Sequence, residues 1–277
     1  MKPAILLKGL SGLVQSFLIF FVVCLTEPVS ANGCGNNIVI CSHAGSYGDI
    51  NSGRASALRA KLSNPELFGS SGAVMAETFS FVSIPSITAA ELTNNSCQIY
   101  FSGYDTSSLI DATEQAALSD WVNGGSDRYI LGGCDSSGYD SVCTALNRSV
   151  TNYPNTPVKI IDSFPPNPVL CSGAYEAEIS GGASSYFTNI GSDIVLTRYD
   201  DGSELIEAIT DSLTGNGKYL LTGDINMWVT PNNSISSGSS ISLINDYFIV
   251  NSFKFAADNT CGRVNAVTGT NLSLIHI

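Results

Sequence analysis

The chain has 277 residues, of which 24 are acidic and 12 are basic, and its formal net charge at pH 7 is −12. An acidic surface with few lysines repels phosphate backbones and anionic lipid, so nucleic acid is a poor partner. The length suffices for one sizeable α/β core, and because no charged or proline-rich linker interrupts the pattern, we expect a single domain.

The first 31 residues have the features of a secretory signal peptide. Lys2 and Lys8 precede an apolar run from Leu13 to Leu25, which is too short to span a bilayer comfortably. The small residues Val29-Ser30-Ala31 mark a cleavage position, so the mature chain should begin near Asn32. We therefore expect a secreted, periplasmic or cell-surface protein without membrane insertion after cleavage.

Beyond the leader, apolar strands alternate with amphipathic segments, which predicts a mainly parallel sheet covered on both faces. The fold class expected is α/β, a three-layer sandwich. Strands are predicted at 37–42, 74–82, 97–102, 128–131, 158–161, 193–197 and 218–222, and helices at 53–62, 111–123, 204–213 and 245–257.

The helix at 111–123 has the clearest start and end. Asp111 and Glu114 can cap its first turn, and Gly124-Gly125 ends it. An apolar stripe that includes Leu118 and Trp121 should face the sheet.

Several predicted strands are followed by a residue able to do chemistry. His43 follows the first strand, Asp105 the third, Asp135 the fourth and Asp224 the last. Ligands of open parallel sheets bind outside the carboxyl ends of strands, so these residues form a hypothetical ligand site. The alternative for each aspartate is a turn or cap role. With neither a calcium-type D-x-D-x-D loop nor a nucleotide-binding glycine pattern, we expect no metal and no cofactor.

Seven cysteines remain once the leader is removed, and an oxidising compartment would favour disulfides among them. Their odd number leaves one free, intermolecular or paired outside this sequence. Two short closures are conceivable, one between Cys134 and Cys143 and one between Cys34 and Cys41, but the connectivity stays open. The candidates are Cys34, Cys41, Cys97, Cys134, Cys143, Cys171 and Cys261.

Cys134 is also a candidate nucleophile. It follows a strand and Gly132-Gly133, where a helix N-terminus would stabilise a thiolate and the glycines would let a substrate approach the backbone. The competing interpretation is a disulfide with Cys143.

The helix ending in Asn123-Gly124-Gly125, the strand entering Gly132-Gly133-Cys134 and the late Thr222-Gly223-Asp224 resemble class I glutamine amidotransferase-like domains of exported proteins. The resemblance covers about residues 37–258 within an expected domain of residues 32–258. It implies a flavodoxin-like fold with Cys134 at the nucleophile elbow.

Two departures from that family pattern argue against glutamine hydrolysis. The family carries G-x-C-x-G and a later H-x-E, whereas Ser136 replaces the last glycine and no histidine lies between His43 and His276. The resemblance then implies a ligand-binding or scaffolding module of a larger protein, with Tyr104, Asp105, Asp135 and Asp224 as ligand contacts and its ligand or protein partner unknown.

A second resemblance is to caspase-like cysteine peptidases, in which one strand ends in Ser-Gly-His-Gly and the next in a cysteine. Here Phe101-Ser102-Gly103-Tyr104-Asp105 places Tyr104 where the catalytic histidine would stand. With an ordinary pKa of about 10, a tyrosine is a poor base at neutral pH. A cysteine-dependent hydrolase of caspase-like or amidase type would have to use Cys134 with His43.

The last residues, 272–277, resemble a translated sequencing adapter, and we expect 259–277 to be a truncated tail of a longer protein. His276 is therefore set aside, which leaves His43 as the histidine available for chemistry.

Overall fold

The computed structural model describes residues 37–103, 105–106, 108–135, 138–152, 158–160, 176–178, 185–199, 205–211, 218–229 and 235–258. All belong to one compact unit, Cys34–Ile277. The leader (residues 1–31) and the tail (residues 259–277) lie outside the described residues, and what the sequence predicts for them stays a prediction. Within the described ranges, no helix is both long and apolar enough to cross a membrane.

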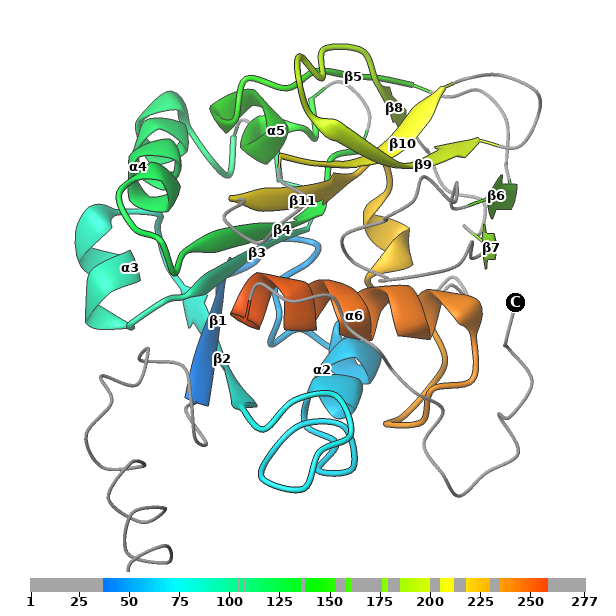
Figure 1. The fold of residues 1–277 in the computed structure, drawn as a ribbon. Coiled ribbons are helices and arrows are strands. Elements are labelled where there is room, and N and C mark those ends of the chain that lie inside the picture. Colours follow the sequence, from blue (N-terminus) through cyan, green and yellow to red (C-terminus); the bar gives the residue numbers. More distant parts are fainter. Residues whose placement is uncertain are drawn as a thin grey trace, which may run out of the picture. The chain divides into compact units, whose positions relative to one another are not determined.

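Five parallel strands form one half of the sheet, in the order β2-β1-β3-β4-β11 (Figure 1). This is the flavodoxin-like order, in which the chain reverses its direction across the sheet between β1 and β3. The fold class expected from the sequence is confirmed. The strands are β1 (Asn37–His43), β2 (Thr78–Ile84), β3 (Ile99–Gly103), β4 (Tyr129–Gly133) and β11 (Tyr219–Thr222).

An antiparallel half continues the sheet beyond β11, in the order β10-β9-β6-β7, and β8 and β5 branch from β10. The sequence pattern did not predict this change of direction. These strands are β5 (Val150–Asn152), β6 (Val158–Ile160), β7 (Glu176–Glu178), β8 (Ser185–Phe187), β9 (Ile194–Tyr199) and β10 (Ile206–Thr210).

The helix predicted at 204–213 is wrong, because Ile206–Thr210 form β10. Its backbone pairs on one side with β11 and on the other with β9, so Ile209 lies opposite both Leu221 and Val195. The β-branched side chains of Ile206, Ile209 and Thr210 suit a strand covered on both faces. Long-range pairing here outweighs the local preference for a helix.

Helices cover both faces of the sheet, which gives three layers (Figure 1). On one face lie α2 (Ser56–Leu62) and α6 (Ile244–Asp258), and on the other lie α3 (Ala89–Asn94), α4 (Ala112–Asn123) and α5 (Ser141–Ala145). A short 3₁₀ helix, η1 (Ile225–Met227), follows β11.

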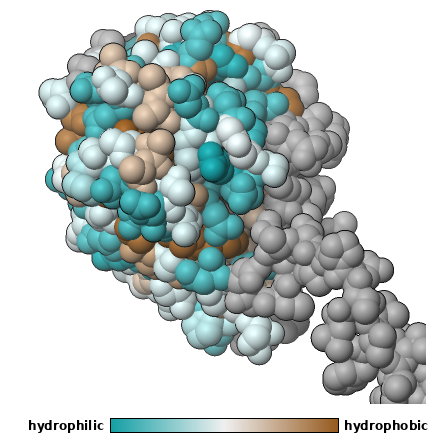
Figure 2. Space-filling view, turned by 90° about the vertical axis from the view of Figure 1, so that its left-hand side faces the viewer, coloured by the Kyte–Doolittle hydropathy of each residue, from teal (hydrophilic) through white to brown (hydrophobic). Residues whose placement is uncertain are grey.

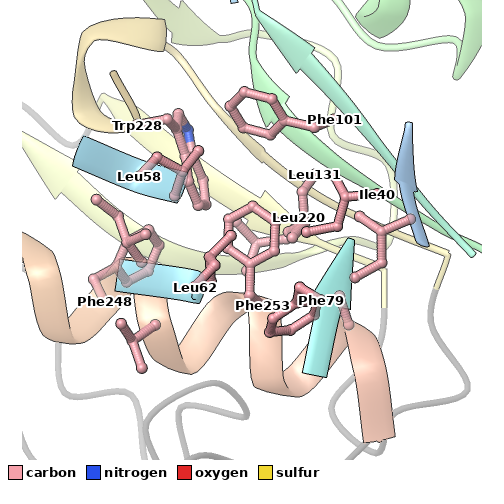
Figure 3. Close-up of a cluster of buried hydrophobic side chains, with 14 of the residues drawn as sticks. Ile40, Leu58, Leu62, Phe79, Phe101, Leu131, Leu220, Trp228, Phe248 and Phe253 are labelled. Atoms are coloured by element: carbon pink, nitrogen blue, oxygen red, sulfur yellow. The ribbon is translucent and has the colours of Figure 1, made fainter. Parts of the chain in front are cut away.

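The core under α2 and α6 is aliphatic and aromatic, as Figure 3 shows. Phe253 of α6 packs against Phe79 and Trp228 with ring centroids 6.0 and 6.1 Å apart, both edge to face. Such pairs add about 0.5–1.5 kcal/mol each beyond the burial of their area.

A buried ion pair joins the two helices of this face. Lys61 Nζ of α2 lies 3.4 Å from Asp246 Oδ1 of α6, and neither side chain is exposed to solvent. The ammonium also donates to Ser236 Oγ and to carbonyl oxygens of the loop at 236–240. Burial lowers the pKa of Lys61, and the charge of Asp246 opposes that shift.

Two disulfides lie under the other helical layer. Cys41 of β1 bonds Cys97, which precedes β3, and Cys134 bonds Cys143 of α5. The second bridge is one of the two short closures considered from the sequence. The other closure, Cys34 with Cys41, is wrong because Cys41 pairs with Cys97. Cys34, Cys171 and Cys261 lie outside the described residues.

The face of the molecule seen in Figure 2 is mainly hydrophilic, with apolar side chains confined to small areas.

Candidate functional site at the carboxyl edge of the parallel strands

His43 ends β1, at the point where the strand order reverses. Its Nδ1 lies 2.8 Å from the carbonyl oxygen of Ala44. Because a carbonyl can only accept, Nδ1 carries the proton, and Nε2 is left as the second functional nitrogen. Nε2 faces Glu114 Oε1 at 3.9 Å, which is an ion pair only when the imidazole is protonated.

Glu114 is held in place by the first turn of α4. Its Oε2 accepts from the backbone N–H of Asp111 at 3.2 Å, which completes a capping box, and its Oε1 accepts from Ile87 N–H at 2.9 Å. The capping role of Asp111 and Glu114 predicted from the sequence is confirmed. The position of Glu114 opposite His43 was not predicted, since only the packing of α4 on the sheet creates it.

Asp105, two residues beyond β3, is the most perturbed carboxyl of this edge. It is almost completely buried, and burial raises its pKa to about 6, against the opposing effects of a hydrogen bond from Ser102 and the charge of His43. Ser102 Oγ donates to Oδ2 at 2.9 Å. The other oxygen, Oδ1, has no partner of normal hydrogen-bond geometry among the described residues, although Ser46 acts on the carboxyl as a hydrogen-bond partner.

Two buried hydroxyls share this environment. Ser46 Oγ and Tyr100 Oη are without hydrogen-bond partners of normal geometry in the described part of the chain. Ser46 nevertheless acts as a side-chain hydrogen-bond partner that lowers the pKa of Asp105, and the backbone of His43 is a hydrogen-bond partner of Tyr100. Burial raises the pKa of Tyr100 well above its ordinary value, and the negative charges of Asp105 and Glu114 raise it further.

These side chains gather because of strand alternation. Successive residues of a strand point to opposite faces, and Cys41 and Tyr100 both lie in the core under α3–α5, so His43 and Ser102 point to that face as well. We call this set the edge cluster. It comprises His43, Ser46, Tyr100, Ser102, Asp105 and Glu114.

The turn between β1 and α2 positions Ser46. Its anchor is Asp49, whose Oδ1 accepts from Ser42 Oγ at 3.1 Å and from Asn51 N–H at 3.0 Å. Burial raises the pKa of Asp49, but hydrogen bonds led by that from Ser83 outweigh it, and the net shift is downward.

Cys134 does not have a free thiol in this structure, because its sulfur is bonded to Cys143. It lies one strand beyond β3, so about 10 Å of sheet separates its backbone from that of His43. The preceding glycines have a packing reason: a Cβ on Gly132 would meet Ser102 O at 2.1 Å, and one on Gly133 would meet Ile225 Cα at 2.5 Å. We expected these glycines to admit a substrate, but in the structure they allow neighbouring backbone to approach closely.

The other predicted ligand contacts lie in different environments. Asp224 is fully buried and caps η1, since its Oδ1 accepts from Asn226 N–H at 2.7 Å. Asp135 is buried beside Cys134, and Tyr104 lies outside the described residues. Of the three proposed ligand contacts that the structure describes, Asp105 alone is brought into the edge cluster with His43. No group of three or more His, Cys, Asp and Glu side chains within the described ranges is placed to hold a metal ion.

Sequence reasoning missed four members of the edge cluster: Ser46, Tyr100, Ser102 and Glu114. Tyr100 and Ser102 alternate within a strand that ends near Asp105, and this periodicity was a usable signal. Nothing in the sequence placed Glu114 or Ser46 against that strand.

No protein-family model and no curated protein matches the chain. Among solved structures, one similar chain is described as a GMP synthase subunit from Thermoplasma acidophilum, with 11% sequence identity and a TM-score of 0.44. The similarity covers 79% of this chain and 94% of that one. It concerns the coarse arrangement of strands and helices, and we carry no residue role over from it.

Proposed function

We propose that this chain is an exported ligand-binding module with a glutamine amidotransferase-like domain that does not hydrolyse glutamine. The observation that carries the proposal is the disulfide between Cys134 and Cys143. A sulfur in a disulfide has no thiolate to attack a carbonyl carbon, so the place of the nucleophile is taken by a structural bond.

Export is supported by the two disulfides together with the signal-peptide features of the first 31 residues. Disulfides persist in oxidising compartments and are rare where glutathione keeps thiols reduced. Both bridges are buried under the same helical layer, which is typical of structural rather than exchanging disulfides.

Ligand binding is supported by the position and chemistry of the edge cluster. Flavodoxin-like sheets bind ligands where the strand order reverses, here between β1 and β3. A buried carboxyl with a raised pKa beside a histidine is typical of functional sites.

The cysteine-dependent hydrolase remains the competing proposal, and it needs Cys134 as a free thiolate. The two proposals can be separated by peptide mapping of the exported protein under non-reducing conditions, with free thiols alkylated before digestion. We expect one peptide pair joined through Cys134 and Cys143, and no alkylation of either residue.

Activity assays complete the test. The exported protein should release no ammonia from glutamine, and the Cys134→Ser variant should behave identically. The Cys143→Ser variant, which frees Cys134, is the matched control. Alkylated Cys134 together with hydrolysis that Cys134→Ser abolishes would overturn the binding-module proposal.

A further inference from the structure

The strand β2 forms one end of the sheet, and within the described chain it is hydrogen-bonded to β1 alone (Figure 1). The two strands pair in unbroken register over seven residues. Ala44 N–H donates to Ile84 O, so the carbonyl of Ile84 faces β1, and every second residue of β2 has the same orientation. The backbone N–H and C=O groups of Phe79, Phe81 and Ser83 therefore point away from the sheet.

This edge lacks the features that keep the sheets of separate molecules apart. Natural edge strands carry charged side chains, proline or a bulge, and β2 (TFSFVSI) has none of these within its seven residues. Asn51 covers the edge only in part, because its Nδ2 lies 3.5 Å from Phe81 O, at the long limit for a hydrogen bond. A carbonyl oxygen has two lone pairs, so Phe81 O can still accept from a second donor.

Apolar side chains on both faces of the sheet are incompletely covered at this edge. Phe81 packs against the core under α2 and α6, and Val82 packs against the core under α3–α5, but both stay partly exposed. Val39 of β1 is partly exposed on the same face as Val82. A further strand beside β2 would remove apolar surface from water on both faces, which favours such an addition.

We propose that β2 pairs with β2 of a second copy of this chain, antiparallel about a twofold axis at Phe81. In this register Phe81 exchanges two backbone hydrogen bonds with the same residue of the second copy. Phe79 of each copy lies opposite Ser83 of the other and exchanges two bonds with it, so every outward N–H and C=O group of the three residues is paired. The two Phe81 rings also become neighbours, which is a favourable cross-strand pair.

A second copy fits this edge better than a charged partner does. The net charge of −12 attracts a basic peptide at long range, yet β2 contains no carboxylate with which such a peptide could pair. The better complement is an uncharged strand, and β2 of another copy is one that always accompanies the protein. Asp49 accepts from Ser83 Oγ, but the twofold register separates the two copies of Ser83 by about 13 Å along the strands, beyond the Debye length of about 8 Å.

The test combines sedimentation velocity with amide hydrogen exchange of the disulfide-bonded exported protein, after alkylation of free thiols. We expect a monomer–dimer equilibrium that shifts toward the dimer as the protein concentration rises. Exchange at the amides of Phe79, Phe81 and Ser83 should slow about tenfold or more as the dimer forms. The amides of Ser80 and Val82 face β1 in either state and serve as the internal reference.

A charge on the edge strand is the first variant. Val82→Lys places two ammonium groups on one face of the paired strands and should weaken dimerisation about tenfold or more. Ala116→Lys adds the same charge at an exposed position of α4 and should leave dimerisation unchanged. Urea titrations of both variants check that they are folded.

A cysteine at the twofold axis tests the register without relying on Val82→Lys. Residues of a hydrogen-bonded antiparallel pair have Cα atoms about 5.5 Å apart, within the range that a disulfide bridges. Phe81→Cys should therefore form a covalent dimer that reduction separates. Thr78→Cys, at an exposed residue of the same strand that lies away from the axis, should not form one.

Three results would overturn the pairing of β2 with a second copy. The first is a monomer at every concentration whose outward amides exchange freely. The second is a monomer with slow exchange at these amides, which would mean that another segment of this chain or a bound peptide covers β2. The third is a dimer that Val82→Lys does not weaken, which would form through another surface. None of these results touches the proposed ligand-binding function, which the thiol mapping decides separately.

Discussion

The face of the sheet covered by α2 and α6 differs from the face covered by α3, α4 and α5 in how it buries polar groups. On the first face, Lys61 and Asp246 are wholly buried, yet each has several partners. On the second face, Asp105 is almost as deeply buried, but it forms no ion pair with any cationic side chain of the described residues.

The difference separates a buried charge that has a full set of partners from one that burial destabilises. A buried pair whose donors and acceptors are matched fixes the positions of its helices, because moving either one would strand a charge. A buried carboxyl without a matching cation costs stability while it is ionised, and this is why burial raises the pKa of Asp105.

The largest effect is expected from breaking the buried ion pair of Lys61 and Asp246. Lys61→Ala leaves Asp246 charged and buried, and should lower the free energy of unfolding by about 3–5 kcal/mol in urea titrations. Arg54→Ala, at an exposed arginine over the ring of Tyr47, is the control and should cost no more than about 1 kcal/mol. A loss below that control value for Lys61→Ala would mean that the ion pair does not fix the two helices.

The next effect concerns the covalent links of the second face. The Cys41–Cys97 bridge closes a separation of 56 residues, and its removal in the double alanine variant should cost about 4 kcal/mol by loop entropy. The Cys134–Cys143 bridge spans only 9 residues, and its double alanine variant should cost about 3 kcal/mol. The opposite ranking in urea titrations under non-reducing conditions would contradict this entropic account.

The last effect has the opposite sign and sharpens the contrast. Burial raises the pKa of Asp105 from 3.8 to about 6, so between pH 4 and 6 the folded protein holds a proton that the unfolded chain has lost. Stability from this group is therefore present at pH 4 and falls by about 3 kcal/mol as the pH rises through 6.

Asp105→Asn should not show that decline, so at pH 7.5 it should be more stable than the unmodified protein by up to about 3 kcal/mol. The advantage should vanish near pH 4, and Asp120→Asn, which removes an exposed carboxyl of α4, should follow the unmodified protein throughout. Identical pH profiles of stability for Asp105→Asn and the unmodified protein would show that burial does not raise the pKa of Asp105.

The sequence predicted the features that local chemistry decides. Asp111 and Glu114 mark the start of α4, and each apolar strand of the parallel half can be recognised from its own local sequence. The strand β10 was missed because its backbone partners are remote along the chain, and the pairing of Cys41 with Cys97 needs β1 and β3 already side by side.

The candidate site was predicted only in part, because local sequence places residues at strand ends but does not show what they contact. His43 and Asp105 follow strands, and sequence order alone indicates a shared edge. Asp224 follows a strand equally well, yet its carboxylate caps η1. Whether an aspartate faces a ligand or a backbone N–H depends on where the chain goes next, which strand patterns do not specify.

The Cys41–Cys97 bridge also determines what a protease can achieve. A single cut anywhere from residue 42 to residue 96, the stretch that holds α2, β2 and α3, leaves both pieces attached through the sulfur atoms. The nicked chain keeps β1 held to the start of β3, and its fragments separate on a gel only after reduction. A nicked domain therefore stays in one covalent piece for as long as this buried bridge remains oxidised.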